Sequence, residues 1–259
     1  MKDKIDIQSL EDKRNVTINK VGVKNVKYPI IVDDRENKTQ NTVADLDIYV
    51  ELPHQHRGTH MSRFLEVLNH FHKDNFIQRL PEFLAEIKKD LNSDSAYVNI
   101  RFPYFMKKTA PVSKTSSLLS YDCSFKASSN DEFKMQLGVK VPITTLCPCS
   151  KEISENGAHS QRSEVNVVLG YDKFIWLEEV IELVESCASC EIYSLLKRVD
   201  EKYVTEKAFD NPRFVEDIVR EVTVKLQKDM RVNWFKVQSE NFESIHNHNA
   251  YACVEHDKR

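Results

Sequence analysis

Glycine is scarce in this sequence, which has only five glycines among 259 residues. They lie far apart, at positions 22, 58, 138, 157 and 170, so no two of them form a phosphate-cradling loop or a GxGxxG dinucleotide-binding fingerprint. If the protein binds a nucleotide, side chains and helix N-termini must therefore hold it.

Long hydrophobic runs are also missing. No apolar run approaches the roughly 20 residues that cross a bilayer, and the polar N-terminus with its alternating charges does not resemble a signal peptide. We expect residues 1–20 to form a mobile arm. Six irregularly spaced cysteines do not indicate the disulfide framework of a small secreted domain. We therefore expect reduced cysteines and a cytoplasmic protein that does not bind a membrane.

An excess of charge of one sign is absent as well. The 37 basic and 40 acidic residues leave a net charge of -3. This balance argues against a dedicated nucleic-acid-binding protein, although a local basic patch could still bind a small anion. With 41% hydrophobic residues, the chain can bury a core as one large domain or two small ones.

Hydrophobic periodicity predicts the same order of elements twice. Strands are predicted within residues 26–53 (a hairpin), 95–105, 118–128, 133–146, 163–171, 232–243 and 248–256. Helices are predicted to begin near Thr59 and Pro81 and to cover 176–196 and 211–227, with Thr59 and Asn211 as N-caps.

This repeated order predicts an α+β fold of two units, each with an antiparallel sheet and paired helices on one face. We expect the first unit at 21–132 and the second at 133–259, with most of the candidate site in the second unit.

Cys147 and Cys149 flank Pro148 in the segment TTLCPCSKEISENGAH. Proline is excluded from a helix interior and favours extended or turn backbone. In an extended chain, residues two apart point to the same side, so both sulfurs would face one pocket at a strand end. A disulfide across that separation of about 6.5–7 Å would be strained. Core packing of two small side chains is the alternative interpretation.

His159 follows on a polar loop, and thiolate and imidazole are favoured ligands of zinc and similar metals. Three protein ligands and a water would indicate a catalytic site, and four a structural one. The carboxylates that could complete the set are Asp200, Glu201, Glu206 and Glu216. Most of these acids can equally be solvated surface residues.

Glu216 differs from the other acids because it lies near the start of a predicted amphipathic helix. A half-buried carboxylate there gains from the helix dipole, and it could accept two N–H bonds from a flat, guanidine-like heterocycle.

A third cluster contains Glu243, His246 and His248 within six positions. The two histidines share parity, so they would face one side of a strand, and such a pair suits proton transfer near neutral pH. An exposed polar turn is the alternative. Cys187 and Cys190 lie three apart inside the predicted long helix, where core packing explains them better than a redox site.

Several long blocks together resemble the type IB GTP cyclohydrolases: LCPCSKEIS, GAHSQRS, LLKRVDEKYVTEKAFDNPRFVED and SENFESIHNH, with GTHMSR and KKTAPVSK in the first half. The resemblance runs from about Val21 to the end of the chain. It implies two tandem tunnelling-fold units in each subunit, and homotetramers with sites at subunit interfaces. It also implies metal-dependent hydrolysis of GTP to formate and 7,8-dihydroneopterin triphosphate, the first step of tetrahydrofolate biosynthesis.

Carried over residue by residue, the resemblance implies that Cys147, His159 and Glu201 bind a divalent ion of zinc, manganese or iron. It implies that Glu216 anchors the guanine and that His246 and His248 line the site. We expect catalytic roles for Cys147, Cys149 and the two histidines, and a substrate-binding role for Glu243. The basic residues expected to bind the triphosphate are Lys107, Lys108, Lys114, Arg63 and Arg162.

The expected chemistry is water attack at C8 of guanine. A divalent metal lowers the pKa of its bound water from about 15.7 towards 7, and a histidine can protonate N7 to make C8 more electrophilic.

Two other hypotheses use the same residues. Cys147 could be a nucleophile, as in the deazaguanine nitrile reductases of the same superfamily, or the chain could be a non-catalytic, metal-stabilised assembly module. The sequence also does not exclude a reaction that releases a cyclic phosphate in place of the linear triphosphate.

Overall fold

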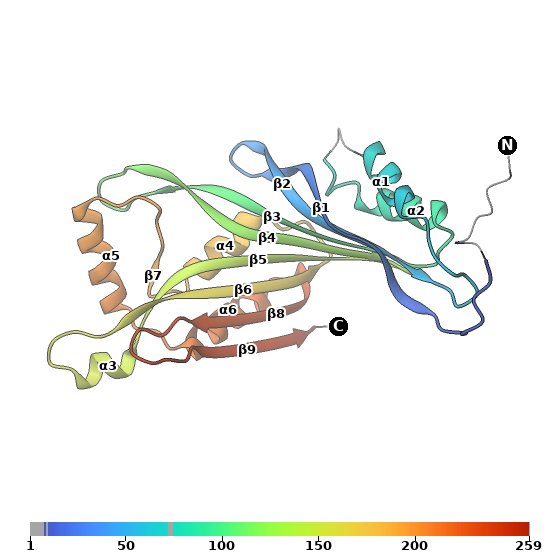
Figure 1. The fold of residues 1–259 in the computed structure, drawn as a ribbon. Helices are drawn as coiled ribbons and strands as arrows, with labels where there is room; N and C mark the ends of the chain where they lie inside the picture. The colour runs from blue at the N-terminus through green and yellow to red at the C-terminus, as the bar shows by residue number, and fades with distance from the viewer. Residues whose placement is uncertain (1–7, 9, 72–74, 259) are drawn as a thin grey trace. The chain divides into compact units, whose positions relative to one another are not determined.

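The computed structural model describes residues 8, 10–71 and 75–258, which form strands and helices of an α+β fold (Figure 1). The chain divides into two compact units. The first comprises Met1–Phe102 and Ser124–Gln136, and the second comprises Pro103–Cys123 and Leu137–Arg259. No helix in the described ranges is both long and apolar enough to cross a membrane.

Three strands contribute residues to both units: β3 (Ala96–Thr109), β4 (Ser116–Ser129) and β5 (Phe133–Leu146). Each is 14 residues long, about 46 Å when extended, so its two ends can belong to different cores. Residues 103–123 consequently belong to the second unit, whereas we expected a single break between 132 and 133.

The first unit begins with a long hairpin followed by two helices. Its own elements are β1 (Ile18–Asp34), β2 (Lys38–Leu52), α1 (Met61–His70) and α2 (Leu80–Asp90). The predicted hairpin and both helices are confirmed, and Pro81 lies in the first turn of α2 as expected. The N-cap of α1 is His60 instead of Thr59, and its side chain makes no capping hydrogen bond.

The start of the chain is bonded to the first unit where the structure describes it. Residues 1–7 and 9 of the predicted mobile arm lie outside the described residues. Beyond them, the carbonyl of Leu10 accepts the N–H of Arg57 at 3.0 Å, and the N–H of Asp12 donates to Gln55 at 3.3 Å. Ile18 already begins β1.

The second unit pairs its strands in the order β3-β4-β5-β6-β8-β9. Its further elements are α3 (Pro148–Ile153), β6 (Ser160–Tyr171), α4 (Leu177–Glu185), β7 (Cys190–Glu191), α5 (Arg198–Asp210), α6 (Val215–Lys228), β8 (Val232–Asn241) and β9 (Ala250–Asp257). Figure 1 shows α4 and α6 side by side against one face of this sheet, as the periodicity predicts for a pair of amphipathic helices.

The predicted long helix at 176–196 is wrong beyond Glu185, where α4 ends. Residues 187–190 are small and buried, and Ser189 and Cys190 bond to β5 instead of continuing the helix. The N–H of Ser189 donates to Thr144 at 3.1 Å, and Cys190 pairs with Thr144 as part of β7. Cys187 and Cys190 are both buried, which agrees with core packing, although they do not lie inside a helix.

Helix α5 occupies the segment between the two helices predicted at 176–196 and 211–227, where no helix was predicted. Asn211 is therefore the C-cap of α5, and its side-chain amide donates to the carbonyl of Ala188 at 2.7 Å. The next helix, α6, has Phe214 as its N-cap, so the prediction of Asn211 as N-cap and Pro212 as first helical residue is wrong.

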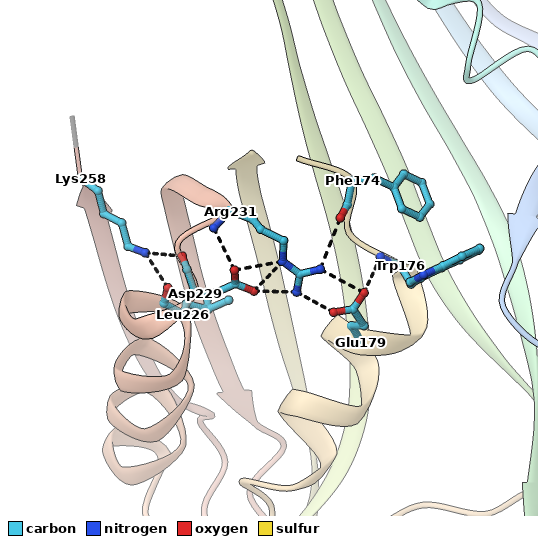
Figure 2. Close-up of polar contacts among 7 residues, drawn as sticks. All are labelled: Phe174, Trp176, Glu179, Leu226, Asp229, Arg231 and Lys258. Carbon is cyan, nitrogen blue, oxygen red and sulfur yellow. Dashed lines mark hydrogen bonds and ion pairs between the residues drawn. The ribbon is translucent and has the colours of Figure 1, made fainter. Parts of the chain in front are cut away.

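Arg231, in the turn between α6 and β8, links the two packed helices (Figure 2). Its guanidinium donates to Glu179 on α4 at 2.6 and 3.3 Å and to Asp229 at 2.8 Å. Hydrogen bonds from Arg231 hold the pKa of both carboxyls below its usual value. Lys258, which follows β9, donates to the carbonyls of Leu226 and Asp229, each at 2.8 Å. This network fixes the helices on the sheet.

Candidate functional site

Cys147 directly follows the last residue of β5 and caps helix α3. Its Sγ accepts the N–H of Ser150 at 3.4 Å. Pro148 starts the helix because the first helical position needs no N–H donor. Cys149 lies in the first turn of α3 and is exposed, whereas Cys147 is half-buried. The expectation that both sulfurs face one pocket from an extended strand is therefore wrong.

The loop from Cys147 to His159 is closed by three hydrogen bonds. The N–H of Cys147 donates to the carbonyl of His159 at 3.1 Å. The Ser150 hydroxyl accepts the N–H of His159 at 3.2 Å and donates to the carbonyl of Cys147 at 3.1 Å. Two residues that are twelve positions apart in the sequence are thereby held side by side, as the motif predicts.

The imidazole of His159 faces three oxygen atoms through Nδ1. Gln161 Oε1 lies at 3.1 Å, Ser244 Oγ at 3.4 Å and Glu243 Oε2 at 4.0 Å. The side chains of His159 and Glu243 are only 16% and 12% exposed. Oε2 of Glu243 is buried and has no hydrogen-bond partner in the described part of the chain. This carboxylate oxygen is therefore available to a group that the single chain does not supply.

The pairing of β6 with β8 explains why Glu243 reaches His159. Ser163 pairs with Asn241, and the N–H of Phe242 donates to the carbonyl of Arg162 at 3.0 Å. Continuing this antiparallel register places Glu243 opposite Gln161, two residues from the histidine.

The N-terminus of α6 lies beside the end of β5, because the N–H of Arg213 donates to the carbonyl of Leu146, the last residue of β5, at 3.0 Å. Glu216 is three residues further on, in the first turn of α6. Its side chain is exposed, so the expectation of a half-buried carboxylate is wrong for the single chain. Asp217, not Glu216, bonds the start of the helix, by accepting the N–H of Phe214 at 3.0 Å.

His246 and His248 lie in the loop between β8 and β9 and are exposed. Their rings stack at 5.2 Å between centroids with an interplanar angle of 14°. They therefore face the same side, as their parity predicts, although the segment is a loop and not a strand.

Comparison with protein families identifies the group to which these features belong. A family model described as type I GTP cyclohydrolase folE2 matches residues 5–252. The chain belongs to the type I GTP cyclohydrolase FolE2 family. The resemblance seen in the sequence motifs is thus confirmed over nearly the whole chain.

Curated relatives named GTP cyclohydrolase FolE2 match over nearly their full length. The protein of Citrifermentans bemidjiense is 52% identical over 253 residues, covering 98% of this chain and 95% of that protein. The protein of Geotalea uraniireducens is 53% identical over 254 residues, covering 98% and 94%. The protein of Thermosipho africanus is 52% identical over 253 residues, covering 97% and 98%.

Among solved structures, urate oxidases share the fold of this FolE2 family member. The uricase of Arthrobacter globiformis matches with a TM-score of 0.51 and 9% identity, covering 92% of this chain and 93% of that one. A urate oxidase mutant of Bacillus sp. TB-90 matches with a TM-score of 0.54 and 9% identity, covering 93% and 99%. At these identities the likeness concerns the fold alone, and it confirms the predicted α+β tunnelling fold.

A metal ion would find only part of its predicted ligand set in a single FolE2 chain. Glu201 is exposed in the first turn of α5. The other end of α5 meets α3, where Lys151 Nζ donates to the carbonyl of Phe209 at 2.5 Å. Eight residues of helix, about 12 Å, separate Glu201 from that contact. Among the residues that the structure describes (8, 10–71 and 75–258), no three His, Cys, Asp or Glu side chains form a metal-binding group.

Asp200, the neighbour of Glu201, has a structural role. Its buried carboxylate accepts the N–H groups of Val112 and Ser113, both at 2.8 Å, and of Lys197 at 2.9 Å. It thereby attaches the start of α5 to the hairpin that joins β3 and β4. The position of the neighbouring Glu201 follows from this attachment.

The basic residues expected to bind phosphate differ in their availability. Lys107 and Arg162 are exposed. Lys108 Nζ lies 2.6 Å from Glu185 Oε2 in a buried ion pair, and Lys114 Nζ donates to the carbonyl of Pro111 at 2.7 Å. Arg63 belongs to the first unit and donates through Nη1 to the carbonyl of Asp90 at 2.9 Å.

Sequence reasoning missed Gln161, which directly contacts His159. Gln161 is 8% exposed and also bonds Thr145, which in turn bonds Ser163. The signal in the sequence is the alternation of β6, in which positions 161, 163, 165 and 167 all face inward. Two polar side chains at the head of such a buried row indicate a role beyond packing.

Proposed function

We propose that this FolE2 family member is a GTP cyclohydrolase that converts GTP and water to formate and 7,8-dihydroneopterin triphosphate, the first step of tetrahydrofolate biosynthesis. The observation that carries the proposal is the closed loop that holds Cys147 beside His159, with Glu243 Oε2, from the end of β8, 4.0 Å from His159 Nδ1. Relatives that match over nearly their full length carry the name of this activity.

The reaction opens the imidazole ring of guanine. Water must add at C8, a weakly electrophilic carbon, and protonation of N7 makes that carbon more reactive. The stacked imidazoles of His246 and His248 are exposed beside the strand end and can deliver the proton. Cys149, exposed in the first turn of α3, can reversibly join the ligands of a bound metal ion.

A divalent ion of zinc, manganese or iron fits the donor types at this place. Cys147 and His159 supply sulfur and nitrogen, and we propose Glu201 as the carboxylate ligand. When bound, such an ion lowers the pKa of its water towards 7. One chain does not bring Glu201 to the other two residues, and Glu201 is exposed. This is consistent with a homotetramer whose sites lie between subunits.

The surface of α5 supports such an assembly. Val199 and Tyr203, one helical turn apart and near Glu201, are 54% and 42% exposed. Apolar side chains in a row on a helix are stabilised when another surface covers them. The homotetramer and the cytoplasmic location stay predictions.

Substrate recognition is proposed for three kinds of side chain. The carboxylate of Glu216, in the first turn of α6, accepts the N–H groups of the guanine edge and is favoured by the helix dipole. Glu243 contacts the substrate through its unpartnered oxygen. Exposed Lys107 and Arg162 bind the triphosphate. Arg63 stays a predicted triphosphate-binding residue.

Turnover of GTP tests the proposal. Purified protein is incubated with GTP and Mn²⁺, Zn²⁺ or Fe²⁺, formate is measured, and the pterin is oxidised to fluorescent neopterin. We expect both products from the wild type and neither from Cys147→Ala. Folded wild-type protein that gives no product with any of the three metals would rule the proposal out. A cyclic phosphate product would be recognised by phosphorus NMR, and a covalent adduct of Cys147 by mass spectrometry.

A further inference from the structure

A buried row of hydrogen bonds leads from the core to His159. Ser163 Oγ and Thr145 Oγ1 are 2.7 Å apart, and both residues are completely buried. Gln161 Nε2 donates to Thr145 Oγ1 at 2.8 Å, and Gln161 Oε1 lies 3.1 Å from His159 Nδ1. The row crosses from β5 to β6 and ends at the imidazole.

The surroundings of Nδ1 determine which nitrogen of His159 carries the proton. All three polar atoms near Nδ1 are oxygens, contributed by Gln161, Ser244 and Glu243. A lone pair on Nδ1 would point towards the carboxylate oxygen of Glu243, which is buried and unpartnered in the described chain. An N–H at Nδ1 donates to Gln161 Oε1 at 3.1 Å and places its positive end, not a lone pair, towards the Glu243 carboxylate 4.0 Å away, so the lone pair is on Nε2.

The same carboxylate fixes the orientation of the Gln161 amide. In the opposite orientation its amino group would face His159, and Nδ1 would then have to accept a hydrogen bond with its lone pair next to Glu243. With Nε2 directed at Thr145, the amide donates to one buried group and accepts from the other. Thr145 and Ser163 hold it there, because a buried amide is costly to leave unpaired.

We propose that Gln161, held by Thr145 and Ser163, is a positioning residue that keeps His159 in its Nδ1–H tautomer. The Nε2 atom is then presented with a free lone pair, as an imidazole must be to bind a divalent cation. This inference rests on the proposed function only for the identity of what Nε2 binds. The tautomer itself is a property of the chain without ligand.

The tautomer can be observed directly by NMR. Protein labelled with ¹⁵N in its histidine rings is studied without metal, at a pH where the imidazole is neutral, and His159 is assigned with a His159→Asn variant. We expect the wild type to show a protonated Nδ1 and a bare Nε2. A wild-type His159 protonated at Nε2 would overturn the proposal, whether or not the protein turns over GTP.

Three substitutions test whether Gln161 determines the tautomer of His159. Gln161→Ala removes the acceptor, so we expect a shift towards the Nε2–H tautomer that free imidazole side chains favour. Gln161→Glu keeps an acceptor oxygen and should restore the Nδ1–H tautomer. Gln238→Ala on β8 removes another glutamine hydrogen bond, to Tyr251, and should leave His159 unchanged. Thermal unfolding of each variant checks that the fold is intact.

Metal affinity gives a second readout. Zn²⁺ binding is measured by competition with a chromophoric chelator, independently of activity. We expect Gln161→Ala to weaken binding by about 10- to 100-fold, with Gln161→Glu close to the wild type. If Gln161→Ala does not fold, Thr145→Val supplies the same test by releasing the amide from the opposite side. If the folded variant keeps both the wild-type tautomer of His159 and the wild-type affinity for Zn²⁺, the hydrogen-bonded row does not position His159.

Discussion

The buried ion pair between Lys108 and Glu185 provides a prediction that separates folding from substrate binding. Lys108 Nζ lies 2.6 Å from Glu185 Oε2, and the Tyr121 hydroxyl donates to Glu185 Oε1 at 2.7 Å. The two charged side chains are 13% and 7% exposed. Burial, followed by the charge of Glu185, raises the pKa of Tyr121 far above its usual value. We therefore expect Lys108 to stabilise the second unit and not to bind the triphosphate.

The perturbation is Glu185→Gln, which keeps the shape of the side chain and an acceptor for Tyr121 but removes the charge. It leaves the largely buried ammonium of Lys108 without its directly bonded carboxylate, so we expect a loss of about 3–5 kcal/mol in the free energy of unfolding. Lys108→Met leaves the carboxylate in the same position and should cost a similar amount. The double variant leaves no unpaired charge, and we expect it to lie within about 1 kcal/mol of the wild type.

Urea unfolding followed by circular dichroism measures these differences, with linear extrapolation of the free energy. Lys202→Met is the matched control, because the pair of Lys202 with Glu206 is 74% and 60% exposed. It should cost less than about 0.5 kcal/mol. Additive costs in the double variant, or a Glu185→Gln protein as stable as the wild type, would refute the reasoning. A large rise of the KM for GTP in a folded double variant would return Lys108 to the phosphate site.

Other substitutions test separate features. Glu216→Gln should lower kcat/KM for GTP by about 10- to 100-fold, because a hydrogen bond to a charged group contributes about 1.5–3 kcal/mol; an unchanged value in steady-state kinetics would exclude it as the guanine anchor. Arg231→Met should lower the free energy of unfolding by about 1 kcal/mol at neutral pH. Its two partner carboxyls have lowered pKa values, so their contribution is present above about pH 4 and is lost as the pH falls through their folded-state values. The difference from the wild type in urea unfolding should therefore shrink in acid. Gly22→Ala should lower the free energy of unfolding by about 1–3 kcal/mol, because a Cβ there would lie 2.0 Å from the carbonyl oxygen of Ile48. Gly58→Ala is the control, since the nearest atom to its Cβ would lie at 3.5 Å, and it should be nearly neutral in thermal unfolding.

The strands were predictable from the sequence because their side chains alternate between core and solvent. In β8 every second residue from Phe235 to Asn241 is more buried than its neighbours, and the same alternation runs through β3 and β6. Helices α1, α2 and α6 were predictable because each buries one continuous stripe.

Helix α5 was not predictable by this reasoning. It buries only Asp200 and Ala208 and leaves Val199 and Tyr203 exposed, so its hydrophobic pattern has no helical period. The opposite error occurred after α4, where apolar residues continued the helical pattern but their backbone paired with β5. In both cases tertiary contacts determined the structure against the local pattern.

The candidate site combines predictable residues with an unpredictable arrangement. Cys147, His159 and Glu216 stand out by residue type and by their resemblance to a family. Gln161 does not stand out, because an inward-facing glutamine in a strand has no motif of its own. Its role follows only from the distance to His159 Nδ1.

The gathering of the site is a consequence of strand order. Cys147 follows the end of β5, His159 precedes the start of β6, and Glu243 follows the end of β8, while β5, β6 and β8 are neighbours in the sheet. In antiparallel neighbours, the end of one strand lies beside the start of the next, so these three positions must meet at one edge although 96 residues separate the first from the last. The pattern of the sequence predicts each strand but not that β6 and β8 pair across the intervening helices. A substitution that breaks this pairing at Asn241 should therefore displace Glu243 while leaving the Cys147–His159 loop closed, since that closure depends only on bonds within the loop.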